Sequence, residues 1–147
     1  MAGKYMIKDA GDKTARARVE DVDVSYKKLA AVCYNVKGMP VDTAMAFLED
    51  VIKKKKAVYF PRWNKKMGHR RELGGKKGRY PIKAAKVVLN LLKNAKANAE
   101  AKGLLSPVIW HIAANKQHIY PRISPKGRPM MSNYETAFVE VILKEKE

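Results

Sequence analysis

Two strand-like runs near the C-terminus, joined by a long polar connection, most constrain what this chain can fold into. The runs are 108–113 (VIWHIA) and 136–143 (TAFVEVIL), both rich in β-branched and aromatic residues. The connection, 114–135, is rich in Asn, Lys, Arg, Pro and Ser, with only scattered large apolar side chains. The pattern predicts one antiparallel hairpin that extends beyond the core, where a partner must supply the packing surface.

Three helices are predicted ahead of this hairpin. The longest runs from Pro81 to about Lys102, where apolar residues recur at helical spacing until Gly103. Two shorter helices meet at Gly38-Met39, the first capped by Asp23 or Ser25 and the second opened by Pro40. The expected buried faces are Leu29, Val32, Cys33 and Val36, then Ala44, Phe47, Leu48, Val51 and Ile52, then Ala85, Val88, Leu89, Leu92, Ala95 and Ala99.

A strand is predicted at 14–19, because small apolar and basic residues alternate there with a period of two. Ala15, Ala17 and Val19 would face the core, and Arg16 and Arg18 would face outward. Residues 1–12 are polar and are expected to form an irregular lead-in, so that 1–147 makes one domain.

Residues 53–80, the basic-aromatic segment, break these patterns. They hold twelve Lys or Arg, one Glu, four Gly and one Pro, and no periodicity fits a helix or a strand. A long segment predicted to lack regular structure within a compact domain is usually functional or disordered. Tyr59, Phe60, Trp63 and Tyr80 argue against disorder. Its cations can neutralise phosphates, its glycines allow close approach to a phosphate chain, and each aromatic either stacks on an unpaired base or packs in the core.

The charge is divided unevenly along the chain. The net charge is +17, yet residues 1–52 carry eight basic and eight acidic side chains, so 53–147 hold the whole excess. From Leu73 to Tyr134 the only acid is Glu100. Such a field predicts a polyanionic partner. We expect no membrane association, because an apolar run of spanning length is lacking, and the absence of a signal-type segment favours a soluble, cytoplasmic protein.

Catalytic and metal chemistry are not indicated. Cys33 is the only cysteine and falls on an apolar helix face, so neither a disulfide nor a thiolate cluster is expected. His69, His111 and His118 lack metal-ligand spacing. The glycine-rich run 74–78 lacks the Gly-Lys-Ser/Thr ending of a phosphate loop, and no nucleophile with a base is recognisable. We therefore predict no enzyme activity, no cofactor, no metal and no small-molecule substrate.

Residues 120–129 are expected to form the end of the hairpin. They contain three prolines, three cations and no acid. Because proline lacks a backbone donor, strand pairing is discouraged there, and Arg122, Lys126 and Arg128 would point toward a partner.

Short motifs spread over residues 14–144 match one known family in order. They are KGM at 37–39, FPR at 60–62, GRYP at 78–81, LKNA at 92–95, NAE at 98–100, KGL at 102–104, HI at 111–112, NK at 115–116 and GR at 127–128. With these motifs the sequence resembles the universal large-subunit ribosomal protein family twenty-two, in its archaeal and eukaryotic form. Bacterial members lack most of 53–79, and their hairpin ends differ from the proline-rich text found here.

The resemblance implies an α+β fold: a small three-stranded antiparallel sheet packed with three helices, plus a long extended β-hairpin. It implies a structural constituent of the large ribosomal subunit that binds its ribosomal RNA and contacts several RNA domains. The globular part would lie near the outlet of the polypeptide exit tunnel, and the hairpin would line the tunnel wall. Neighbouring large-subunit proteins and the nascent polypeptide would be further partners.

With this resemblance, the basic pattern yields a set of candidate RNA-binding residues. The set is Arg16, Arg18, Arg62, Trp63, Lys65, Lys66, Arg70, Arg71, Lys76, Lys77, Arg79, Tyr80, Lys116, Arg122, Lys126, Gly127 and Arg128. One alternative is an architectural DNA-binding protein whose arm tips wedge between base steps. Another is an RNA-modifying enzyme, which would need a cofactor loop or catalytic cluster.

Overall fold

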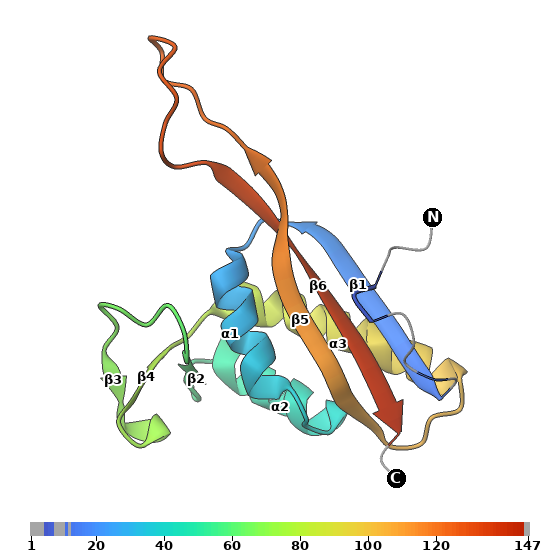
Figure 1. The fold of residues 1–147 in the computed structure, drawn as a ribbon. Helices are drawn as coiled ribbons and strands as arrows, with labels where there is room; N and C mark the ends of the chain where they lie inside the picture. Colours follow the sequence, from blue (N-terminus) through green and yellow to red (C-terminus); the bar gives the residue numbers. More distant parts are fainter. Residues whose placement is uncertain (1–4, 8–10, 12, 146–147) are drawn as a thin grey trace.

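The computed structural model describes residues 5–7, 11 and 13–145, and its centre is a three-stranded antiparallel sheet covered by three helices on one face (Figure 1). The strands are β1 (Thr14–Val22), β5 (Pro107–Tyr120) and β6 (Tyr134–Glu145), in the order β1-β6-β5. The helices are α1 (Tyr26–Val36), α2 (Val41–Ile52) and α3 (Ile82–Ala101). The predicted α+β class, with three helices, this sheet and a long hairpin, is confirmed.

The apolar periodicity located the core correctly. All of the predicted face of α1 and all of that of α3 are buried, and α2 buries Ala44, Leu48 and Val51 while Phe47 and Ile52 pack partly against the core. Cys33 lies in this core, and burial raises the pKa of its thiol to about 12. The helices therefore owe their positions mainly to apolar burial.

The predicted ends of the elements need small changes. Pro40 precedes α2 as its N-cap rather than standing at its first position, and Ser25 precedes α1 without a side-chain capping bond. β1 continues to Val22 beyond a register shift after Val19. Residues 5–7 and 11 have no regular structure, and the rest of the expected lead-in lies outside the described residues.

The hairpin is more regular than its sequence predicts. β5 and β6 pair from Pro107–Glu145 to Tyr120–Tyr134, so the connecting loop covers only 121–133, called the tip loop below. The predicted connection 114–135 thus contains the outer parts of both strands together with the tip loop. Strand pairing needs only backbone partners, and outside the core no alternation of apolar side chains marks it.

The basic-aromatic segment contains a second sheet, which the sequence did not predict. Its strands are β2 (Val58–Tyr59), β3 (His69–Arg70) and β4 (Lys76–Arg79), in the order β2-β4-β3, with a 3₁₀ turn η1 (Arg71–Leu73) between β3 and β4. The expectation of a segment without regular structure was wrong, because strands of two to four residues carry no readable period.

Figure 1 shows the hairpin and the second sheet projecting from different parts of the body. The tip loop lies far beyond the last turn of the helices, whereas the second sheet lies beside α1 and α2. Among the described residues, none of the helices combines the length and apolarity that crossing a bilayer requires.

Candidate nucleic-acid interface

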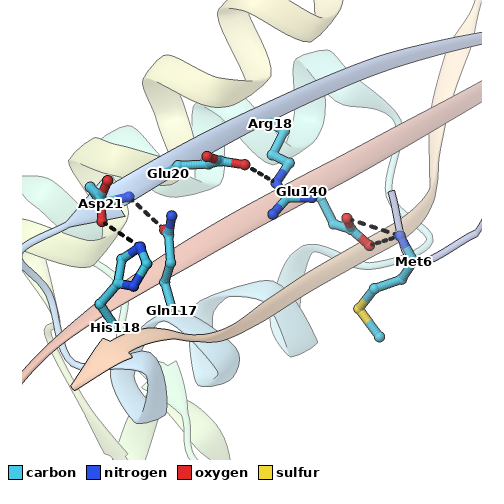
Figure 2. Close-up of polar contacts among 7 residues, drawn as sticks. All are labelled: Met6, Arg18, Glu20, Asp21, Gln117, His118 and Glu140. Atoms are coloured by element: carbon cyan, nitrogen blue, oxygen red, sulfur yellow. Dashed lines mark hydrogen bonds and ion pairs between the residues drawn. The ribbon is translucent and has the colours of Figure 1, made fainter. Parts of the chain in front are cut away.

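Acidic side chains support the root of the hairpin, which is the part of β5 and β6 beside the end of β1. The Asp21 amide donates to Gln117 Oε1 at 2.7 Å, and Thr136 Oγ1 donates to Asp21 Oδ1 at 3.3 Å. His118 Nε2 lies 3.8 Å from the same carboxylate (Figure 2). Both hairpin strands are thus tied to the end of β1, just where the third strand stops accompanying them.

A second acidic contact holds the outer side of this root. Asp23 accepts a hydrogen bond from Lys83 Nζ at 2.8 Å and another from the Tyr134 hydroxyl. The bond and charge of Lys83 keep the pKa of Asp23 below its usual value. Tyr134 in turn packs 5.8 Å from Tyr120 across the hairpin. Among the described residues, the hairpin beyond this pair has no hydrogen bond or ion pair to the body.

The tip loop is held by backbone contacts alone among the described residues. Ser124 N donates to Arg128 O at 2.8 Å, Gly127 N to Ser124 O at 2.9 Å and Met130 N to Arg122 O at 2.9 Å. Gly127 has φ +75°, a turn conformation that side chains disfavour. Arg122, Lys126 and Arg128 are all exposed, as predicted.

The second sheet, in contrast, is cross-linked by its side chains. Glu72, the only acid of the basic-aromatic segment, accepts the buried Ala57 amide at 3.0 Å and the Tyr80 hydroxyl at 3.0 Å. The bond to Glu72 raises the pKa of Tyr80. Arg70 lies over the Tyr80 ring at 5.1 Å and donates to Gly78 O at 3.2 Å. Arg70 and Tyr80 therefore help to build the sheet as well as border its surface.

Gly78 is also needed for internal packing. A Cβ at this position would lie 2.8 Å from Val58 O and closer still to Leu73 Cδ1. The sequence interpretation gave this glycine a role in close approach to phosphate, but the close approach is to its own sheet. Gly68 has open space around it.

The remaining cations of the segment form the exposed surface of this sheet and its loops. Lys77 is half-buried, and its backbone carbonyl accepts the Phe60 amide at 3.1 Å. Lys76 lies over the Tyr59 ring at 5.5 Å. The exposed candidates here are Arg62, Lys65, Lys66, Arg70, Arg71, Lys76 and Arg79.

Three candidates lie outside the tip loop and the second sheet, and each is engaged by another group of the protein. Arg18, with a side chain only 17% exposed, pairs with Glu20 at 2.8 Å (Figure 2). It also lies over the Phe138 ring at 4.4 Å. Arg16 lies over Tyr5 at 5.6 Å. Lys116 bonds Glu135 at 2.7 Å, which raises the pKa of Lys116. The candidates therefore form several surfaces rather than one patch.

The sheet face away from the helices carries a buried carboxylate that the sequence did not reveal. Glu140 is fully buried on β6 and accepts the Met6 amide at 3.3 Å through each oxygen (Figure 2). It also lies 3.7 Å from His111 Nε2. Burial raises the pKa of the neighbouring Tyr5 hydroxyl. This face thus anchors residues 5–7 against the sheet.

Sequence analysis also missed three exposed residues of α1 that border the basic-aromatic segment. Lys27 and Lys28 line a cavity with Trp63, Arg79 and Tyr80. Tyr34 is 60% exposed and packs 6.2 Å from Tyr59. The sequence contains one indication of this surface, because Tyr34 is an aromatic residue that lies outside the predicted apolar face of its helix. Across the described residues, no three His, Cys, Asp or Glu side chains converge as metal ligands would.

An α+β body with two basic projections is typical of the structural proteins of ribonucleoprotein particles. The family model of ribosomal protein L22p/L17e matches residues 17–144. The chain belongs to this ribosomal protein family. Membership makes it a structural protein of the large ribosomal subunit, a cytoplasmic particle active in translation, and not an enzyme.

Several archaeal proteins are similar over nearly the whole chain. Large ribosomal subunit protein uL22 of Methanocaldococcus jannaschii is 44% identical over 147 residues, covering 97% of this chain and 94% of its own length. The protein of the same name from Methanopyrus kandleri is 40% identical over 141 residues, covering 92% and 89%. That of Thermoplasma volcanium is 39% identical over 138 residues, covering 91% and 92%.

Proposed function

We propose that this protein binds large-subunit ribosomal RNA through its two basic projections and joins several RNA domains. The body lies near the outlet of the polypeptide exit tunnel, beside neighbouring large-subunit proteins, and the hairpin lines the tunnel wall along which the nascent polypeptide passes. The observation that carries this proposal is the tip loop, which holds three exposed cations far from any packing surface of its own body.

The proposed affinity comes from phosphate neutralisation. Each phosphate contact releases condensed counterions, so binding weakens as salt is added. The logarithm of the binding constant falls against the logarithm of the salt concentration with a slope of about −0.7 to −0.9 per contact. The exposed cations of the second sheet and tip loop carry most of this effect. Arg16, Arg18 and Lys116 carry less, because protein groups already surround or pair with their charges. Specificity comes from RNA shape and from ordering of the tip loop on binding.

Charge reversal at the tip loop tests the proposal. The variant R122E/K126E/R128E should fold normally but incorporate poorly into large subunits, or leave them on a salt wash. The control K37E/K86E/K93E makes the same charge change at exposed positions of the body. Equal incorporation, salt resistance and translation for wild type and the tip variant would contradict the proposed role of the tip loop.

The position in the tunnel has a separate test. I123C, labelled with a photocrosslinker, places the probe on an exposed tip residue, whereas L105C places it on an exposed body residue. Cys33 is buried and should stay unlabelled. We expect short nascent chains to crosslink to position 123 and not to position 105. Crosslinks absent from position 123 at every chain length would refute tunnel lining.

A further inference from the structure

The four aromatic residues of the basic-aromatic segment have different surroundings. Phe60 is buried in the core. Tyr59 is half-buried between Tyr34 and Lys76. Tyr80 is bonded to Glu72 and covered by Arg70. Trp63 is 44% exposed, so it is the aromatic of this group with the most accessible ring.

Trp63 borders a cavity of about 200 Å³ between α1 and the turn that follows β2. The lining residues are Ala30, Ala31, Tyr34, Pro61, Arg62 and Trp63. Two aromatic rings and three small apolar residues thus surround a space with one guanidinium. Since a water occupies about 30 Å³ of liquid, this cavity has room for a planar ring system.

Arg62 supplies the positive charge in the lining of this cavity, and no acid lines it. A second cavity of about 250 Å³ also borders Trp63, and its lining includes Lys27, Lys28 and Arg79. Neither lining contains Asp or Glu. An aromatic ligand with anionic groups attached on either side would match both the apolar interior and the charged surroundings.

The position of Trp63 is fixed before any ligand arrives. Its ring packs against Tyr26 at 5.6 Å in an edge-to-face arrangement. Its backbone has φ +51°, which is unusual for a bulky residue. Asn64 Nδ2 supports the turn by donating to Phe60 O at 3.2 Å. A ring held this way loses little freedom when a ligand stacks on it.

We propose that the cavity beside Trp63 binds one unpaired base of RNA, stacked on the Trp63 ring, with its neighbouring phosphates near Arg62 and Lys27 or Lys28. This site rests on the proposed RNA binding and adds a base contact to it. Paired bases in an A-form helix do not offer their faces to a side chain, so the ligand is a single-stranded or bulged nucleotide.

Tryptophan emission tests the site in the full-length protein. W110F leaves Trp63 as the only tryptophan, and W63F leaves Trp110, which is 45% exposed on another part of the body. The probes are a short oligoadenylate and an RNA duplex of equal length. We expect oligoadenylate to quench Trp63 emission more than the duplex does, and to leave Trp110 emission nearly unchanged.

Affinity provides the second measurement, by anisotropy of labelled oligoadenylate. Loss of base stacking in W63A should weaken binding about fivefold or more, whereas the matched variant W110A should bind like wild type. W63F should recover part of the loss.

The outcomes separate this site from the proposed function. If oligoadenylate binds while Trp63 emission does not change, or if W63A binds as tightly as W110A, the base site is refuted and RNA binding stands. If wild type binds neither RNA at low salt, both the site and the proposed function fail.

Discussion

The second sheet and the tip loop present positive charge in two different ways. The second sheet is held by Glu72, whose exposed carboxylate joins Ala57 to Tyr80, and by buried Gly78, against which Leu73 and Val58 pack. All of the thirteen residues of the tip loop except Ser124 are exposed, and backbone bonds hold its turn. One basic surface is therefore held by the protein's own contacts, and we propose that the other gains its packing from RNA.

The difference follows from one acid and one glycine rather than from charge density. Glu72 gives a cationic segment an internal partner, and the small size of Gly78 lets two strands and a turn close over it. The tip loop has no acid, and its prolines withdraw backbone donors. A basic segment can thus form a well-packed structure when a few of its own residues supply hydrogen-bond partners and close packing.

Filling the space at Gly78 should destabilise the second sheet more than removing the Glu72 carboxylate does. G78A places a Cβ against Val58 O and Leu73, so the second sheet must shift. Overpacking of this kind costs about 1–3 kcal/mol in the free energy of unfolding. Urea unfolding measures the loss, with G68A as the control in open space. Equal stability of the two variants would show that the sheet is not closely packed.

Removing the Glu72 carboxylate should have a smaller effect. In E72A the buried Ala57 amide loses its acceptor, which costs about 1 kcal/mol. Amide hydrogen exchange should become faster across 57–80 and stay unchanged in the tip loop. The control E100A, at an exposed position of α3, should change neither the stability nor the exchange rates. Unchanged exchange at Ala57 would mean that the sheet does not need this bond.

Acid should loosen the hairpin root by a small amount. Because the folded pKa of Asp23 is below 3.8, its contribution is present above 3.8 and is lost as pH falls through the lowered pKa. The Tyr134 ring resonances should therefore shift in acid in wild type and not in D23N. An acid shift of equal size in D23N would assign the change to another group.

Sequence patterns were sufficient wherever apolar periodicity places an element. Leu92 and Val32 lie on the predicted faces of their helices, and the hairpin follows from its two strand runs. The second sheet could not be predicted, because β2 has only two residues and depends on Glu72, a contact distant in sequence. The burial of Glu140 likewise depends on the Met6 amide, which comes from the far end of the chain.

The candidate site was only partly predictable for the same reason. Exposure of Arg122, Lys126 and Arg128 follows from an acid-free, proline-rich run. The sequence does not indicate that Trp63 is more exposed than Phe60 and Tyr80, because that difference depends on which ring the fold covers. Sequence can locate a basic segment, but the contacts of each side chain decide which residues remain available.

Amide hydrogen exchange across 121–133, in the free protein and in assembled large subunits, tests the central claim most directly. The account predicts rapid exchange in the free protein and strong protection in the subunit, while β4 is protected in both. Slow exchange of the tip loop in the free protein, or rapid exchange in both states, would contradict the claim that RNA supplies its packing surface.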